Sequence, residues 1–111
     1  MNVTLITYPA TDLDATKRFF RVLTGTDPYA EAPQYVGYRD GDMEIGLVPK
    51  GHQPGALPFW TVSDIASSVK ALEAVGGTVV QGIRDVAYGL LVATVKDPNG
   101  SIVGLRQFPK S

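Results

Sequence analysis

The chain has 111 residues, of which 44% are hydrophobic, and a formal net charge of −1 at pH 7. This length and composition predict one globular domain that buries roughly two-thirds of its unfolded surface. The ten basic residues are scattered, which argues against nucleic acid as a partner, and no apolar run reaches the roughly 18 residues that a membrane span needs. The first residues lack the features of a signal peptide, so we expect a cytoplasmic protein. The absence of cysteine excludes disulfides and thiolate metal ligands.

The first half of the chain predicts a strand, a helix and three further strands. Apolar and β-branched residues favour a strand over residues 2–9. Asp12 is a typical N-cap for a helix over residues 13–23, and Gly25 is suited to end it in a left-handed conformation. The apolar stripe of this helix comprises Leu13, Thr16, Phe20 and Leu23, widened by Phe19 and Val22. Short strands are expected over residues 27–31, 34–39 and 43–48.

The second half follows in the same order after a linker with glycine and proline over residues 51–55. It predicts a strand over residues 57–62 and a helix that Ser63 or Asp64 caps and that Gly76-Gly77 ends. The buried stripe of this helix is Ile65, Val69, Leu72 and Val75. Further strands are expected over residues 78–82, 90–96 and 101–107, with residues 84–89 as a loop and Asp97-Pro-Asn-Gly100 as a hairpin turn.

The two halves repeat one another with an offset of 52 residues. Leu5 corresponds to Leu57, and Asp12 corresponds to Asp64. A repeat of this length in a short chain indicates two copies of one supersecondary unit. We therefore predict one α+β domain over residues 1–111 that contains two tandem βαβββ modules, residues 1–50 and 56–109.

This order of elements resembles the vicinal oxygen chelate superfamily, which comprises glyoxalases, bleomycin resistance proteins and extradiol dioxygenases. The resemblance covers essentially the whole chain. It rests on the segment Asp12-Leu-Asp-Ala-Thr-Lys-Arg-Phe-Phe-Arg-Val-Leu-Thr-Gly25 and on the last hairpin, Asp97-Pro-Asn-Gly100. It implies a curved half-barrel sheet that has its helices on the convex side and encloses a pocket. It also implies a homodimer, because such open sheets commonly pair.

In the metal-using members of the superfamily, each module supplies two ligands, which are His, Glu or Gln. The resemblance places these ligands at Leu5, Gly46, Leu57 and Gly104, and none of these side chains can coordinate an ion. The two glycines would instead leave extra room in the pocket. The single histidine, His52, lies in the linker, where it is either a general base or a solvated side chain. We therefore expect a metal-free branch of the superfamily, with no metal and no cofactor.

Strand alternation predicts which side chains line the pocket. The expected set is Leu5, Thr7, Glu44, Gly46, Val48, Leu57, Phe59, Thr61, Ile102, Gly104 and Arg106, together with Tyr38, which either lines the pocket or sits within the sheet. Phe59 either stacks on a planar ligand or packs in the core. Arg106 either pairs with an anionic group or lies exposed at a strand end. Trp60 and Tyr8 have the opposite parity and are expected to pack beneath the helices.

We interpret the chain as a metal-independent protein that binds or sequesters a small, partly apolar molecule in this cavity. One alternative is an enzyme of the lyase or dioxygenase type, either metal-free or with displaced metal ligands. A second alternative is a regulatory or partner-binding domain. The expected partners are a small-molecule ligand and a second copy of the chain, with no nucleic acid and no membrane.

Overall fold

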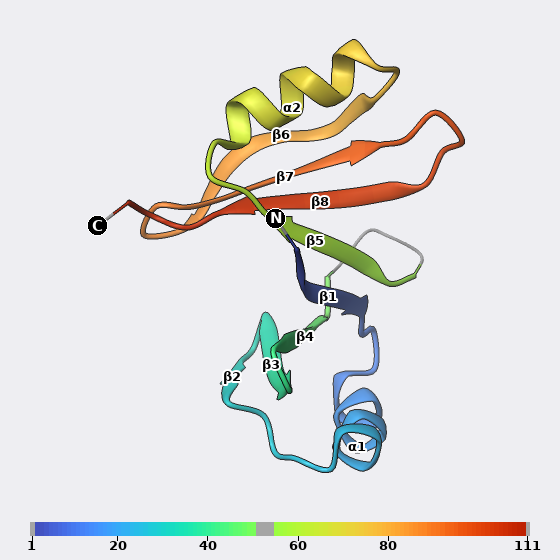
Figure 1. Ribbon diagram of the computed structural model, residues 1–111. Helices are drawn as coiled ribbons and strands as arrows, with labels where there is room; N and C mark the ends of the chain where they lie inside the picture. Colours follow the sequence, from blue (N-terminus) through green and yellow to red (C-terminus); the bar gives the residue numbers. More distant parts are fainter. Residues whose placement is uncertain (1, 51–54, 111) are drawn as a thin grey trace. The chain divides into compact units, whose positions relative to one another are not determined.

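The computed structural model describes residues 2–50 and 55–110, and the chain divides into two compact units. One unit is Thr4–Pro58, and the other combines Met1–Val3 with Phe59–Ser111. Figure 1 shows that the elements follow the βαβββ order twice. Residues 51–54 of the predicted linker, with His52 among them, lie outside the described residues.

The first repeat contains β1 (Val3–Pro9), α1 (Leu13–Thr24), β2 (Ala30–Ala32), β3 (Tyr35–Asp40) and β4 (Met43–Val48). Helix α1 begins after Asp12, whose carboxylate accepts a hydrogen bond from the Ala15 amide at 3.1 Å. It ends at Gly25, whose φ of 73° is the left-handed conformation that glycine adopts without strain. Both predicted caps of this helix are therefore confirmed.

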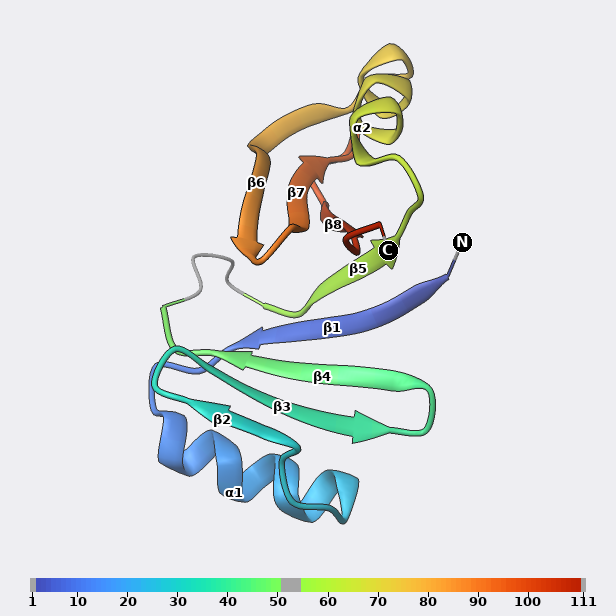
Figure 2. The same ribbon diagram turned by 90° about the vertical axis from the view of Figure 1, so that its left-hand side faces the viewer.

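The strands of the first repeat form a sheet in the order β2-β3-β4-β1. Neighbours are antiparallel except β1 and β4, which run parallel. Figure 2 shows these strands side by side with α1 next to them. The core lies between α1 and the sheet, where Phe20 packs with Tyr38 and Leu47. The Tyr38 hydroxyl donates to the Lys17 carbonyl at 3.3 Å, which satisfies a polar atom in this buried position.

The second repeat contains β5 (Leu57–Thr61), α2 (Ile65–Ala74), β6 (Thr78–Ala87), β7 (Leu90–Lys96) and β8 (Ile102–Gln107). Its strands follow the order β5-β8-β7-β6, with β5 parallel to β8 and the other pairs antiparallel. Asp64 caps α2 by accepting a hydrogen bond from the Ser67 amide at 3.1 Å. Ile65 and Val69 of α2 pack against Leu105 in the core of this unit. The predicted α+β class is thus confirmed.

The main difference from the predicted elements concerns residues 84–89, because the prediction of a loop there is wrong for residues 84–87 and holds only for the turn at residues 88 and 89. Strand β6 continues to Ala87 and pairs with β7 through several register shifts, which explains its irregular sequence pattern. Tyr88 and Gly89 then form the turn, with φ values of 48° and 91°, as tight hairpins require at both central positions. In the first repeat, β2 (Ala30–Ala32) is shorter than the predicted strand over residues 27–31.

Both predicted helix stripes extend too far. Val75 is 73% exposed and lies just beyond the end of α2. On α1, Phe19, Val22 and Leu23 are exposed, whereas Phe20 is buried. No helix in the described part of the chain has the length and apolar character that crossing a bilayer would require.

Candidate functional site

In the first unit, the sheet face opposite α1 carries the residues that were predicted to line the pocket. The register of β1 and β4 places Leu5 beside Glu44 and Thr7 beside Gly46. Val48 continues this face of β4, because alternate residues of a strand point to the same side. Leu5 and Gly46 are buried, whereas the other three are partly exposed.

Two glycines of this face lie directly beneath tyrosine rings. A Cβ atom at Gly46 would come 2.5 Å from the hydroxyl oxygen of Tyr35, and one at Gly37 would come 2.9 Å from the hydroxyl oxygen of Tyr29. Only glycine allows a ring to approach the strand this closely. The space that was predicted at Gly46 is therefore filled by an aromatic side chain of the protein itself.

Tyr29 connects a carboxylate and a guanidinium group on the same face. Its hydroxyl donates a hydrogen bond to Oε1 of Glu44, and Cζ of Arg39 lies 4.3 Å from its ring centroid. Burial and this hydrogen bond raise the pKa of Tyr29. The hydroxyl therefore remains protonated at neutral pH and holds the Glu44 carboxylate in a fixed orientation.

In the second unit, an equivalent arrangement occurs where β5 pairs with β8. Phe59 is in register with Gly104, and a Cβ atom at Gly104 would come 2.5 Å from Cε2 of Phe59. Further along this face, Nε of Arg106 donates to Oγ1 of Thr61 at 3.2 Å, and its Cζ lies 4.8 Å from the ring centroid of Phe108. Arg106 is only 6% exposed, so the structure does not place it as an exposed strand-end side chain.

The remaining residues of the predicted set lie on both sides of the sheets. Leu57 and Ile102 share the alternation of Phe59 and Gly104, and Leu57 is buried. Tyr38 instead lies in the core beneath α1, on the face opposite Gly46. Its position agrees with the alternative in which Tyr38 sits within the sheet.

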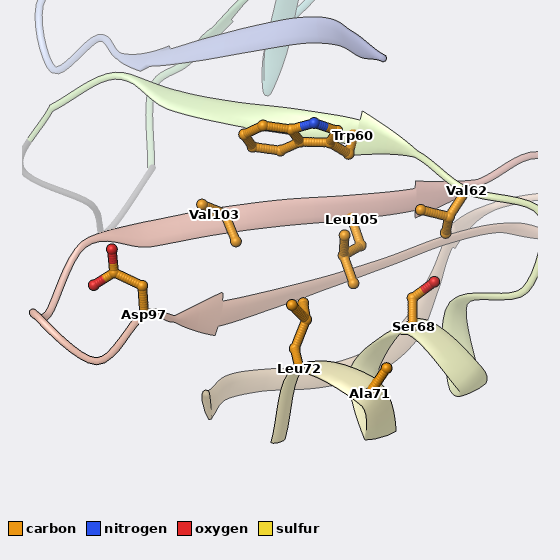
Figure 3. A pocket seen from close by; sticks show the side chains of 8 residues that line it. All are labelled: Trp60, Val62, Ser68, Ala71, Leu72, Asp97, Val103 and Leu105. Atoms are coloured by element: carbon orange, nitrogen blue, oxygen red, sulfur yellow. The ribbon is translucent and has the colours of Figure 1, made fainter. Parts of the chain in front are cut away.

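Trp60 lies on the helix side of its sheet, as its parity predicts, but it is only partly buried. It borders a pocket of about 420 Å³ between the sheet and α2 (Figure 3). Sequence reasoning missed this pocket. The available signal was the pair of small residues Ser68 and Ala71, which lie one turn apart on α2 and leave space opposite the indole.

A second hollow, of about 580 Å³, lies beside α1 in the first unit. Two ion pairs border it: Lys17 with Glu31 at 2.6 Å and Arg21 with Asp27 at 2.8 Å. Because these charges already neutralise each other, this hollow offers less to a ligand than the pocket beside Trp60 does.

Residues 3–105 match the Glyoxalase/Bleomycin resistance protein/Dioxygenase superfamily. The chain belongs to this superfamily. The match spans both repeats and confirms the family that the sequence motifs indicated. No curated protein matches the chain.

Solved structures share the fold of this superfamily member. The hypothetical protein BH1468 from Bacillus halodurans C-125 has a TM-score of 0.79 at 14% identity, covering 99% of this chain and 96% of that chain. A superfamily member from Vibrio splendidus 12B01 has a TM-score of 0.72 at 17% identity, covering 96% and 97%. A variant of Streptomyces coelicolor methylmalonyl-CoA epimerase in complex with 2-nitronate-propionyl-CoA has a TM-score of 0.73 at 17% identity, covering 99% of both chains. At these identities the likeness shows the fold alone.

The residues of this superfamily member do not fit a metal ion at the expected positions. These positions are occupied by Leu5, Gly46, Leu57 and Gly104, which have no donor side chains. In addition, the rings of Tyr35 and Phe59 lie over the two glycines. Within residues 2–50 and 55–110, no three His, Asp or Glu side chains gather in a way that could hold a metal ion.

Proposed function

We propose that this chain is a metal-independent member of the superfamily that binds a small, partly apolar molecule on the sheet faces opposite its helices. The observation that carries the proposal is that aromatic rings lie over two of the positions where the superfamily's metal ligands were expected. Tyr35 covers Gly46, and Phe59 covers Gly104. The partly exposed Tyr35 ring offers rigid apolar surface to a ligand, whereas the Phe59 ring is itself buried and supports the face of its own sheet from below.

Polar groups beside each ring support the binding of a partly apolar rather than a wholly apolar molecule. In the first unit, Thr7 and the Glu44 carboxylate lie beside the ring-covered glycine. In the second unit, Thr61 and the buried Arg106 guanidinium follow Phe59. Few, well-oriented polar groups among apolar walls are typical of small-molecule sites.

Calorimetric titration with a panel of aromatic antibiotics and metabolites tests this function. We expect at least one compound to bind at about micromolar affinity or tighter, which corresponds to about −8 kcal/mol, and EDTA should leave its affinity unchanged. The variant Tyr35→Ala should weaken binding at least about tenfold, which corresponds to about 1.4 kcal/mol.

The matched control for this titration is Tyr88→Ala, because Tyr88 is fully exposed in the hairpin turn. It should bind the same compound as tightly as the parent protein. The absence of binding by every compound of a broad panel would count against the binding function. Stoichiometric zinc, nickel, manganese or iron in the purified protein would refute its metal independence.

An enzyme is the second candidate, and the oriented Glu44 carboxylate favours it. The hydrogen bond from Tyr29 fixes Glu44 on the proposed binding face, as a base that abstracts a proton must be fixed. Because an epimerase shares the fold, methylmalonyl-CoA in D₂O is a direct probe. Catalysis would be supported over storage if the parent protein exchanges the α-proton of this compound and Glu44→Gln, at an unchanged melting temperature, does not.

We also propose that the protein forms a homodimer. Strands β2 and β6 end their sheets and each pair with a single neighbour among the described residues, and such edges are commonly covered in native assemblies. Sedimentation equilibrium should give twice the chain mass, and a monomer at micromolar concentration would contradict this proposal.

A further inference from the structure

The pocket beside Trp60 lies on the face of the second sheet that α2 covers, opposite Phe59 and Arg106. Helix α2 packs on β6, β7 and β8. Trp60 belongs to β5, which lies next to β8 at the end of this unit's strand order. A hollow of about 420 Å³ therefore remains between the indole and the helix (Figure 3).

Apolar side chains form the walls of this pocket. They are Trp60, Val62, Ala71, Leu72, Val103 and Leu105. Val62 and Leu105 are buried at 5% and 4% exposure, whereas Trp60 is only half-buried. The volume falls within the range of about 300–1,000 Å³ that is typical of small-molecule sites.

The hollow exists because α2 presents small side chains at this point. Ser68 and Ala71 are three residues apart and therefore share a helix face. Leucine at Ala71 would occupy the space opposite the indole. The pocket is thus a consequence of residue size at two positions.

One charge borders this apolar space. Of the eight lining residues, only Asp97 is charged, and Figure 3 shows it at the end of the pocket away from Ser68. Its Oδ1 accepts hydrogen bonds from the amides of Asn99 at 2.8 Å and Ser101 at 2.9 Å. The turn therefore fixes the carboxylate at the edge of the pocket, where a cation bound against the apolar walls could reach it.

We propose that this pocket is a second binding site, which takes small amines with an aromatic or flat apolar body. The body lies against Trp60 and Leu72, and the ammonium group pairs with Asp97. A cation that approaches the indole face gains a further attraction to the ring. An anion of the same shape is disfavoured by the Asp97 charge. The site lies on the opposite face from the one in the proposed function and does not depend on it.

Fluorescence of Trp60 tests the proposal directly, because Trp60 is the only tryptophan of the chain. Phenylbutylamine and phenylbutyrate share a ring and a chain but carry opposite charges. We expect the amine to change the emission saturably and to bind at least about tenfold more tightly than the acid, a difference of about 1.4 kcal/mol. The variant Asp97→Asn keeps the acceptor oxygen for the turn and should remove this preference.

Two leucine variants locate the binding site on α2. Ala71→Leu fills the pocket and should weaken amine binding at least about tenfold, which corresponds to about 1.4 kcal/mol. Ala66→Leu makes the same change at another exposed position of the same helix and should leave binding unchanged. Tyr35→Ala, on the other unit, should also bind the amine as the parent does. Melting curves by circular dichroism confirm that each variant is folded.

The proposal is overturned if the amine leaves the emission unchanged, if both ions bind equally, or if folded Ala71→Leu binds like the parent. Trp60 emission that changes when the protein alone is diluted would show that a second copy covers the pocket, and it would overturn the proposal as well.

Discussion

Replacing Gly104 with alanine tests the close approach of Phe59 to β8. The new Cβ atom would lie 2.5 Å from Cε2 and 2.8 Å from Cγ of Phe59. Because Cγ is attached near the backbone and the ring is only 8% exposed, the clash cannot be relieved by moving a free tip. Overpacking of this kind destabilises the fold by about 1–3 kcal/mol. Alanine also lowers the conformational entropy of the unfolded chain, which stabilises the fold by about 0.4–1 kcal/mol. We expect a net loss on the order of 1–2 kcal/mol in the free energy of unfolding.

Urea unfolding with linear extrapolation measures this loss. The matched control is Gly82→Ala, because a Cβ atom at Gly82 meets nothing within 4 Å, and this variant should be stabilised by about 0.4–1 kcal/mol. In a Phe59→Leu background the cost of Gly104→Ala should fall, giving a coupling energy of about 0.5–3 kcal/mol in a double-mutant cycle. Equal stability of Gly104→Ala and Gly82→Ala, at unchanged urea dependence, would refute the reasoning.

Three further predictions concern metals and pH. Adding Ni²⁺, Mn²⁺ or Zn²⁺ should leave the melting temperature as it is in EDTA. A native metal site would instead add about 2.7 kcal/mol to the free energy of unfolding when the metal concentration is about a hundred times the Kd. The folded-state pKa of Tyr29 is raised by burial and by Glu44, so its contribution to stability is fully present below the unfolded value of about 10 and is lost as pH rises toward the folded value. Tyr29→Phe should therefore flatten the alkaline fall in melting temperature, and Tyr88→Phe, at a fully exposed ring, should not. The Ser67 amide lowers the pKa of Asp64, so this contribution is present above the unfolded value of about 3.9 and is lost as pH falls through the folded one. Asp64→Asn should lose less stability than the parent in acid, and parallel acid melting curves would contradict the capping argument.

Local signals in the sequence predicted most of the fold. Asp12 and Asp64 were recognisable as caps because a cap and its amide partner lie within four residues. The last part of β6 was missed because its strand conformation depends on pairing with β7, for example of Arg84 with Val92, and no local pattern encodes that pairing. Val75 was misplaced because helical spacing gives the direction of a side chain, whereas burial depends on what packs against it.

The candidate site was predictable only in part. Strand alternation correctly separated the two faces of each sheet. Thr7 and Gly46 lie together on the face opposite α1, and Trp60 lies on the face that α2 covers. The sequence shows a glycine at position 46, but it does not show that Tyr35 lies on it, because strand pairing brings the two together. The pocket beside Trp60 was missed for a similar reason. An empty space is defined by what several elements fail to fill.

The aromatic rings over Gly46 and Gly104 also affect the order in which substitutions can be introduced at these positions. Introducing histidine at Gly104 would force its side chain into the volume of the buried Phe59 ring, whereas at Gly46 the nearest atoms belong to the tip of the partly exposed Tyr35 ring. A donor side chain can therefore enter position 104 only after the neighbouring ring has become smaller. Engineering a donor into position 104 should therefore begin with Phe59, since the reverse order of steps passes through an overpacked and less stable variant.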